Sequence, residues 1–511
     1  MALIRHPGAD RAATPRSLVT VSVMLATIMQ ALDTTIANVA LPHMQGSMSA
    51  TQDQIAWVLT SYIVAAAIAT PLSGYLAGRI GRTRLFLASV AGFTIASMLC
   101  GAAQSLPQIV VFRLLQGVFG ASLVPLSQSV LLDTYPREKH GAAMAMWGVG
   151  VMVGPILGPT LGGYLTEYYN WRWVFYINLP FGILSFLGIL AFVRETVADT
   201  LRRFDWMGFA MLSLAIGALQ LMLDRGQSQD WFNSTEIVLE AVVAGLCLYL
   251  FLVHMFTAER PFIEPGLFKD RNFAIGLLFI FIVGVILLAT LALLPPFLQN
   301  LLGYPVLTTG LVLAPRGVGT MIGMMLVGRL AGKVDERAMI LLGLGLTALS
   351  LWEMAGFNID VGPWALVRTG ITQGLGLGFI FVPLSTITFT TLAPRYRNEG
   401  TAMFSLMRNI GSSLGISVMF TLLAQNTQAY HGVLSESITP FRPLLHLPGA
   451  WDPATTAGLA ALNNEVSRQA AMIAYLQDFR LMMVFVLAAI PLLLLLHGPR
   501  RNARAPAPLI D

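Results

Sequence analysis

One carboxylate inside an apolar stretch is the residue of this chain best suited to chemistry. Asp33 lies within the apolar run 17–41, and Gln30, Thr34 and Asn38 fall near it on one helical face. A bare carboxylate in hydrocarbon costs roughly 3 kcal/mol, so Asp33 must face a cavity or a partner. Burial favours the neutral acid and a nearby cation favours the ionised form, a combination that suits proton exchange. A carboxylate paired permanently with a cation for structural reasons is the alternative.

Arg113 is the cation expected to meet Asp33. The apolar run 108–132 begins near Pro107, which places Arg113 roughly 9 Å and Asp33 roughly 12 Å below the same membrane surface. Gln116 follows at i+3 and adds a polar group to the same helical face. Arginine stays protonated, so its role would be electrostatic. The pair would weaken when Asp33 takes up a proton, and that change would favour one conformation of the protein over another.

Charged residues in the second half of the chain are further candidates for a cavity. Arg368 takes roughly the repeat position of Arg113, and Arg408 lies in the run 402–423. For both arginines, a role in binding or coupling and a structural role stay open. Arg316 and Glu353 complete the charges within the second-half runs, and Glu353 is close to the end of its run.

Methionines gather in several runs proposed to line the pore, among them Met144 and Met152 in the run 142–165. Their flexible thioethers suit a cavity that repacks around varied apolar ligands, although ordinary helix packing explains them equally well. No metal-ligand spacing, nucleophile elbow, phosphate loop or nucleotide fingerprint is found, so we expect no enzyme activity, no metal and no cofactor.

The composition indicates a polytopic membrane protein. Of the 511 residues, 56% are hydrophobic and only 11% charged, and the mean hydropathy is +0.70. The net charge of +5 does not indicate nucleic-acid binding, because the basic residues lie between apolar runs rather than in one patch. Fourteen runs are long enough to span a membrane: 17–41, 55–77, 85–104, 108–132, 142–165, 174–193, 207–223, 236–256, 273–297, 309–331, 339–357, 363–390, 402–423 and 480–497.

Lysine and arginine indicate the orientation. With fourteen spans, 22 of the 31 basic residues fall on the side of the two chain ends, five fall on the other side and four lie within spans. The positive-inside rule therefore predicts that both termini are cytoplasmic.

The chain repeats itself at an offset of about 255 residues. Gln116-Gly117 returns as Gln373-Gly374, and Val124-Pro125-Leu126-Ser127 returns as Val382-Pro383-Leu384-Ser385. Two parallel halves of six helices are a transporter architecture, with the substrate site near the midplane between them. The predicted organisation is a tail at 1–16, a first half at 17–194, two inserted spans and linkers at 195–272, a second half at 273–497, and a tail at 498–511.

The fifth span carries a stripe of small residues that lets a neighbouring helix approach closely. Its prolines free backbone carbonyls that neighbouring helices must cover. The residues concerned are Gly150, Gly154, Pro155, Gly158, Pro159 and Gly162.

The outward segment 424–479 is long for a loop. It contains a turn-rich stretch and then a helix predicted from about 455 to 476. A solvated loop is one interpretation, and a docking surface or a lid over the outer mouth is the other.

Four motifs together resemble the fourteen-span drug:proton antiporters of the major facilitator superfamily, of the EmrB/QacA type. LDTTIANVALP (32–42) resembles the first-span motif, FRLLQGVFGASLVPLSQS (112–129) the fourth-span motif, and the glycine-proline stripe the antiporter motif. GYLAGRIGRTRLFL (74–87) resembles the cytoplasmic loop motif, with Gly74, Arg79, Gly81 and Arg82 at its matching positions. Gly78 stands where many superfamily members have aspartate, which puts a gate latch using that carboxylate in doubt.

The resemblance implies an all-α major facilitator fold, with Asp33 as the proton site and Arg113 as its coupling partner. LQLMLDRGQSQDWFNSTEI (219–237) is similar to the EmrB branch of Gram-negative bacteria. That likeness implies an inner-membrane pump driven by the proton gradient, which exports hydrophobic drugs or amphiphiles with a periplasmic adaptor and an outer-membrane channel. A dedicated exporter of one metabolite or fatty acid, and a transporter-like receptor without flux, are the alternatives.

Overall fold

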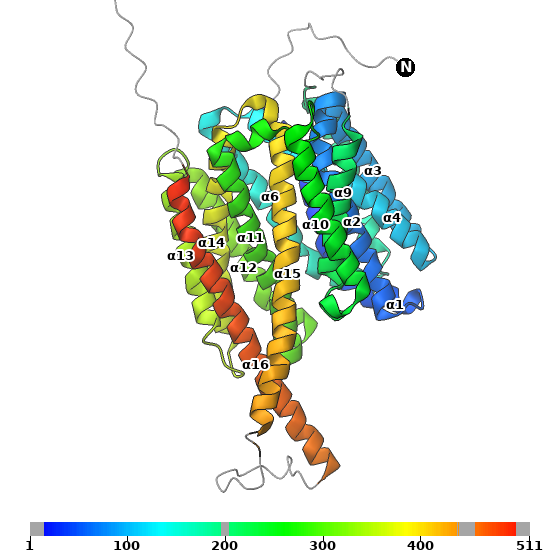
Figure 1. Cartoon of the computed structure of the whole chain (residues 1–511), viewed down its shortest axis with the longest axis vertical. Coiled ribbons are helices and arrows are strands. Elements are labelled where there is room, and N and C mark those ends of the chain that lie inside the picture. Colours follow the sequence, from blue (N-terminus) through cyan, green and yellow to red (C-terminus); the bar gives the residue numbers. More distant parts are fainter. Residues whose placement is uncertain (1–14, 196–203, 437, 439–454, 497–511) are drawn as a thin grey trace, which may run out of the picture.

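The computed structural model describes residues 15–195, 204–436, 438 and 455–496, and every regular element in these residues is a helix (Figure 1). Fourteen helical segments of this part are long and apolar enough to span a membrane, which confirms the predicted fold class. The predicted terminal tails and the turn-rich stretch near residue 445 lie outside the described residues, apart from residues 15 and 16. The helices are α1 (Arg16–Ser47), α2 (Gln52–Ile80), α3 (Arg82–Ala102), α4 (Leu106–Gly120), α5 (Leu123–Thr134), α6 (His140–Tyr168), α7 (Trp173–Tyr176), α8 (Asn178–Phe192), α9 (Trp206–Arg225), α10 (Thr235–Thr257), α11 (Arg271–Pro296), α12 (Val306–Leu330), α13 (Glu336–Met354), α14 (Pro363–Thr390), α15 (Arg397–Glu436) and α16 (Thr456–Ala489).

The same helix pairing occurs twice. In the first half α1 packs against α6, α2 against α4, and α3 against both α4 and α8. In the second half α11 packs against α15, α12 against α14, and α13 against both α14 and α16. Helices α4 and α5 together form the fourth span, and α9 and α10 are the insertion. The internal repeat therefore corresponds to two six-helix halves of like construction.

The inserted helix α9 packs against one helix of each half, α2 and α15. Toward α2, Asp224 accepts a hydrogen bond from Thr60. Toward α15, Gln220 Nε2 donates to Ser413 Oγ (2.9 Å), and the carbonyl of Leu223 accepts from Ser417 Oγ (2.7 Å). The insertion thus bridges the two halves along one flank.

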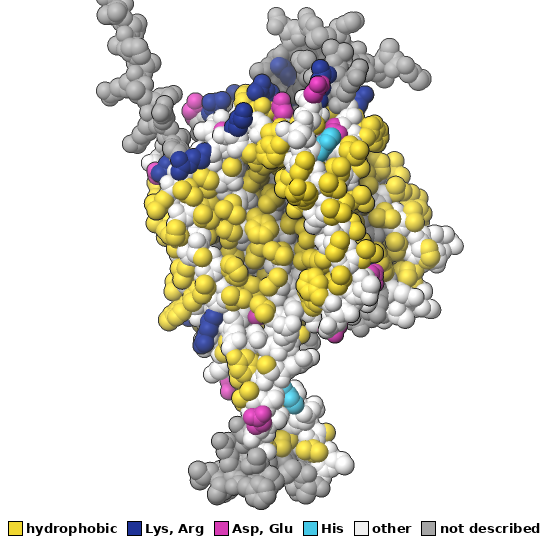
Figure 2. Space-filling model, viewed as in Figure 1, with side chains coloured by type: hydrophobic (Ala, Val, Ile, Leu, Met, Phe, Trp, Pro, Cys, Tyr) yellow, Lys and Arg dark blue, Asp and Glu magenta, His cyan; other side chains and the backbone are white. Residues whose placement is uncertain are grey.

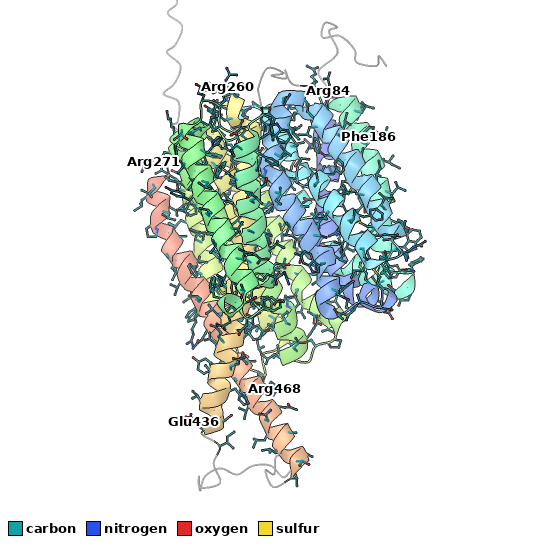
Figure 3. The ribbon with its side chains drawn as sticks, turned by 45° about the vertical axis from the view of Figure 1, so that its right-hand side comes forward. Arg84, Phe186, Arg260, Arg271, Glu436 and Arg468 are labelled. Carbon is teal, nitrogen blue, oxygen red and sulfur yellow. The ribbon has the colours of Figure 1, made fainter. Side chains whose placement is uncertain are left out.

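The two ends of the helix bundle differ in charge and shape. Lysine and arginine gather at the end where α1 begins, with Arg84 and Arg260 among them, and we call this end the basic side (Figures 2 and 3). At the opposite end α15 and α16 protrude as a helical pair, and we call this end the hairpin side (Figure 1). An apolar surface band lies between them, as a membrane-spanning protein requires.

Helix α15 is longer than the apolar run 402–423 predicts. It contains 40 residues, about 60 Å at 1.5 Å per residue, or about twice a ~30 Å hydrocarbon core. Hydropathy falls after Leu423, but the following residues contain no proline before Glu436, so the helix continues into water. Beyond the bundle it pairs with α16, where Tyr430 and Gln477 form a hydrogen bond and Leu462 and Val466 are buried.

The glycine stripe of α6 fits the backbone of α1. A Cβ atom added at Gly154 would lie 2.4 Å from the carbonyl carbon of Ala31, and one at Gly158 would lie 2.1 Å from Thr35 Oγ1. Thr35 Oγ1 also donates to the carbonyl oxygen of Gly154 (3.0 Å). The absence of side chains at these positions is therefore what allows α1 and α6 to touch.

We predict that Gly154→Val destabilises the protein by about 1–3 kcal/mol, the usual cost of overpacking. The added methyl groups would overlap the backbone of α1, which cannot move aside as a side chain can. The measurement is the midpoint of thermal unfolding of the purified protein. Gly163→Val is the matched control, because a Cβ at Gly163 meets nothing within 4 Å; equal midpoints for the two variants would contradict the prediction.

Candidate functional site

Asp33 is buried inside the first half and accepts three hydrogen bonds there. The donors are Arg113 Nη1 (2.7 Å), Gln116 Nε2 (2.8 Å) and Asn178 Nδ2 (2.8 Å), from helices α4 and α8. Asp33, Gln116 and Asn178 have no exposed surface, and Arg113 is 1% exposed. The structure thus brings together Asp33, Arg113 and Gln116, which the sequence had indicated as one site.

Arg113 is held on every side. Its Nε donates to the carbonyl oxygen of Val58 (3.1 Å), and its Nη1 also donates to Gln116 Oε1 (2.8 Å). The guanidinium lies over the ring of Tyr62, with its carbon 4.3 Å from the ring centroid. Cation–π contact and hydrogen bonds therefore keep the cation in place whether or not Asp33 is ionised.

The sequence analysis did not identify Asn178, Ser97 or Tyr62 as members of this network. Asn178 donates to both Asp33 and Ser97 Oγ (2.9 Å), and Ser97 in turn donates to the carbonyl oxygen of Phe175 (2.8 Å). The available signal was weak: a single asparagine at the start of the apolar sixth span and one serine within the third.

The other predicted polar residues of α1 lie at a range of depths. Gln30 is half-buried, with its Nε2 3.5 Å from Tyr62 Oη. Thr34 is half-buried and donates to the carbonyl oxygen of Ala31 in its own helix (2.9 Å). Asn38 is exposed. Along α1, Gln30 lies on the basic side of Asp33, whereas Thr34 and Asn38 lead from Asp33 toward the hairpin side.

Arg368 lies two residues from the repeat position of Arg113 and does not take its place in the structure. Gln373 Nε2 lies 3.4 Å from Thr290 Oγ1, just as Gln116 Nε2 lies against Asp33, and this alignment makes Gly370 the counterpart of Arg113. Arg368 is two residues away, 58% exposed, and pairs with Glu353 at 3.4 Å. A sequence repeat interrupted by gaps gave the offset only to within a few residues.

Arg408 and the predicted methionines lie on helices that pack against the other half, α15 against α2 and α5, and α6 against α12. Arg408 is half-buried, with its Nη2 3.5 Å from Asn409 Oδ1. Met144 is fully buried and Met152 half-buried on α6, the helix that packs against α12 of the second half.

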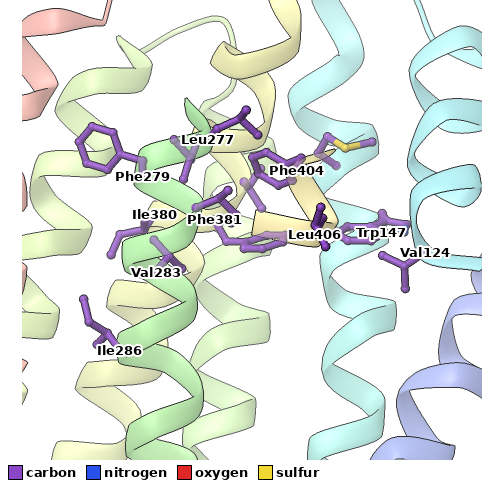
Figure 4. Close-up of a cluster of buried hydrophobic side chains, with 14 of the residues drawn as sticks. Val124, Trp147, Leu277, Phe279, Val283, Ile286, Ile380, Phe381, Phe404 and Leu406 are labelled. Atoms are coloured by element: carbon purple, nitrogen blue, oxygen red, sulfur yellow. The ribbon is translucent and has the colours of Figure 1, made fainter. Parts of the chain in front are cut away.

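Aromatic rings join the halves at the basic end of α6. Trp147 is fully buried and stacks on Phe381 of α14, with ring centroids 5.8 Å apart (Figure 4). Its Nε1 donates to Ser127 Oγ (2.7 Å), which fixes the ring from the first-half side. The path between the halves is filled at this level.

A polar cluster closes the basic side. Asp133, at the end of α5, forms ion pairs with Arg82 of its own half and with Arg397 of the other half. Beside it Ser129 donates a hydrogen bond to Asn398. These contacts fasten the start of α15 to the first half.

The two halves do not meet in the same way along their length. Helix α6 follows α12 from the basic side, where Gly141 meets Ala331, to the level at which Gly317 meets Ile156. By contrast, α1 and α11 do not pack closely against each other. The described structure is therefore a conformation closed on the basic side.

Comparison with known proteins decides the family. Residues 23–416 match the sequence profile of the Major Facilitator Superfamily. The chain belongs to the major facilitator superfamily. It is 39% identical to the multidrug export protein EmrB of Escherichia coli strain K12 over 83% of this chain and 84% of that protein. It is 36% identical to the fatty acid resistance protein FarB of Neisseria gonorrhoeae over 94% and 96% of the two chains.

Solved structures agree on the fold. The human organic anion transporter MFSD10 superimposes with a TM-score of 0.60 at 15% identity, covering 92% of this chain and 99% of that one. The proton:xylose symporter XylE superimposes with a TM-score of 0.61 at 13% identity, covering 93% and 96%. At these identities the likeness establishes the major facilitator fold alone.

The loop motif of the superfamily lies against the closed basic side. A Cβ at Gly74 would come within 2.9 Å of the Cα of Glu399, so glycine lets α2 meet α15. Gly81 has φ +95°, a conformation that favours glycine, and turns the chain from α2 into α3. Arg79 donates to Tyr75 Oη (3.2 Å), and a Cβ atom added at Gly78 would meet nothing within 4 Å. Asp133 supplies the carboxylate that links the halves here.

We predict that Asp133→Asn opens the basic side. The substitution removes the charge shared by Arg82 and Arg397, and charge-assisted hydrogen bonds each contribute about 1.5–3 kcal/mol. The expected result is a longer distance, measured by electron–electron double resonance, between spin labels placed at Lys139 and Lys333 in a cysteine-free background.

Glu138→Gln is the control for this experiment. Glu138 carries the same charge on the same side, is exposed, and belongs to none of the ion pairs of the described residues. If Asp133→Asn and the native protein gave the same distance distribution, the Asp133 ion pairs would not be what holds the basic side closed.

Proposed function

We propose that this protein exports hydrophobic and amphiphilic compounds across the inner membrane of a bacterium in exchange for protons. The buried network around Asp33 carries the proposal. In this network an ionisable carboxylate within a membrane-spanning segment is paired with a cation that stays charged, and the whole lies inside a transporter fold.

Protonation of Asp33 would change its bonds selectively. A neutral carboxyl group loses most of its attraction for Arg113, whereas Arg113 keeps Val58, Gln116 and the Tyr62 ring. Helix α1 would thus be released from α4 without leaving a cation unpartnered.

The release would reach the interface between the halves through α6. Ala31, two residues before Asp33, lies against Gly154 of α6. The opposite side of α6 meets the second half, where a Cβ at Gly148 would touch Met324 and Gly317 lies against Ile156. A small shift of α1 would therefore bear directly on the helices that rock against each other.

The energy available from the membrane potential is similar in size to the cost of breaking the Asp33–Arg113 pair. Moving one charge through 100 mV yields about 2.3 kcal/mol, and removing one partner of a buried ion pair costs about 3–5 kcal/mol. One proton bound at Asp33 is therefore enough to shift a two-state equilibrium appreciably.

Orientation follows from charge. We infer from the positive-inside rule that the basic side is cytoplasmic and that both termini lie there. On this assignment the conformation described is closed to the cytoplasm, the state in which substrate leaves and a proton enters from outside. The proton gradient then takes the place of a cofactor.

Relatives indicate the substrates and leave their breadth open. One is named for multidrug export and another for fatty acid resistance. Both point to hydrophobic or amphiphilic molecules moved outward. A dedicated exporter of a single metabolite or fatty acid remains the second candidate, because the FarB likeness covers 94% of this chain.

The protruding helical pair suits a role in a larger assembly. Glu436 and Arg468 mark its two helices beyond the apolar band (Figure 3), and His431 Nε2 lies 3.0 Å from Asn463 Oδ1 between them. A paired helical extension of this length could hold a periplasmic adaptor and, through it, an outer-membrane channel. We propose that the protein is the inner-membrane pump of such a tripartite system.

Asp33→Asn is expected to abolish proton-driven export. Asparagine keeps the size of the side chain but cannot titrate. Dye movement driven by a proton gradient should fall, in inverted membrane vesicles, to the level of native vesicles treated with a protonophore. The control is Asp230→Asn, an exposed outer-loop residue whose φ of +57° asparagine tolerates. Full transport by Asp33→Asn would end the proposal for this site.

The hairpin is tested by shortening it. We predict that replacing residues 430–474 with a short glycine-serine linker leaves transport into inverted vesicles intact, because the shortened protein keeps its apolar spans. The same variant should no longer protect whole cells from a toxic substrate, which must cross the outer membrane too. Cell protection equal to that of the native protein would contradict a docking role.

A further inference from the structure

The second half holds a buried arginine without a counter-charge. Arg316, on α12, is 5% exposed, and Nη2 donates to the carbonyl oxygen of Leu287 on α11 (3.2 Å). Its Nη1 atom has no hydrogen-bond partner among the described residues. None of the ion pairs among the described residues includes Arg316.

A second unpaired polar atom lies close by. Gln373 of α14 is fully buried and its Oε1 has no partner among the described residues, whereas its Nε2 lies against Thr290. Thr290 follows Leu287 by three residues, which is one turn of the same face of α11. Gly370 and Gly374, on either side of Gln373, lie directly against Arg316.

The first half shows what is missing. The offset of 257 residues that aligns Gln116 with Gln373 also aligns Asp33 with Thr290. In the first half a buried guanidinium is matched by a carboxylate, whereas in the second half a threonine occupies the position of the carboxylate. Gly370 takes the repeat position of Arg113, so the buried cation of the second half comes instead from Arg316 on α12, and the repeat supplies no carboxylate for it.

A buried charge is stable only with a partner, and a guanidinium is matched best by a carboxylate. The described chain provides none for Arg316, so the position suits a ligand that carries one. The amide of Gln373 can present either its oxygen or its nitrogen to such a ligand.

The position favours a transported molecule over a membrane lipid headgroup. Arg316 and Gln373 are both ten residues from the start of their helices at Val306 and Pro363. At 1.5 Å per residue they lie about 15 Å deep, near the midplane where transporters of this architecture bind substrate. Gly317, the next residue, lies against Ile156 of the first half, so the site borders the interface between the halves.

We propose that Arg316, supported by Gln373, binds the carboxylate of an amphiphilic anion carried by this transporter. The inference rests on the proposed export function and names its substrate class: molecules with one carboxylate and an apolar remainder. The carboxylate of the ligand neutralises the charge of Arg316, and the apolar part of the ligand packs among the membrane-spanning helices.

The test is equilibrium binding to the purified full chain in lipid nanodiscs, without any proton gradient. Radiolabelled dodecanoate is the probe, and unlabelled dodecanoate, dodecanol and chloride are the competitors. Dodecanoate should compete and dodecanol should not, because they differ in the charged group alone. Displacement by dodecanol, or by chloride at the same concentration, would overturn the proposal.

Arg316→Gln should weaken dodecanoate binding about 10- to 100-fold, the loss expected for one charge-assisted hydrogen bond. Arg316→Lys should recover part of that loss, since lysine restores the charge but not the planar fork. Arg468→Gln, on the hairpin, is the control for loss of one positive charge. The unfolding midpoint of Arg316→Gln should not fall, because the variant removes an uncompensated buried charge.

Two outcomes separate this inference from the proposed function. Unchanged dodecanoate affinity in Arg316→Gln overturns the binding site and leaves proton-coupled export standing. Asp33→Asn should lose gradient-driven transport but keep an Arg316-dependent site, so that adding Arg316→Gln to Asp33→Asn still weakens dodecanoate binding about 10- to 100-fold. Native binding together with gradient-independent transport would instead overturn proton coupling and leave the Arg316 site intact.

Discussion

A carboxylate and a guanidinium buried among membrane helices can exist there only if each satisfies the other, and the first half is arranged around this requirement. Asp33 on α1 uses donors from α4 and α8, while Arg113 reaches α2 as well. Four helices are therefore tied to one pair of charges. No water is available in hydrocarbon to replace a lost bond, so any change in the protonation of Asp33 must be answered by a change in these helices.

Close backbone contact between α1 and α6 transmits a movement of α1 to the interface between the halves. Gly154 and Gly158 allow α6 to lie on the segment of α1 that carries Asp33, and α6 is also the helix that follows α12 across the interface. With larger residues in the stripe, a shift of α1 would be absorbed by flexible side chains. Direct contact between backbones passes the shift on, because packed helices have few intermediate arrangements.

Properties that vary along a single helix were predictable, and those that depend on the lateral order of helices were not. Run length and repeat gave the fourteen spans and the two halves, and depth below one surface placed Asp33 level with Arg113. Asn178 and the Asp133–Arg397 pair depend on which helices are neighbours, which no periodicity encodes. Hydropathy also predicted that the thirteenth span ends at residue 423, because hydropathy reports which residues suit lipid. The helix itself continues in water to Glu436.

The two halves share a construction but not a charge balance, and that difference bears on how exchange could work. A proton and a substrate anion that used the same arginine could exchange by simple displacement. Here Arg113 is already paired with Asp33 in the first half, and Arg316, which has no ion pair among the described residues, lies in the second. In the proposed mechanism the two ligands therefore do not compete for one site. Their coupling must pass through the contact of α6 with α12, so that binding in one half changes the affinity of the other only when the halves move.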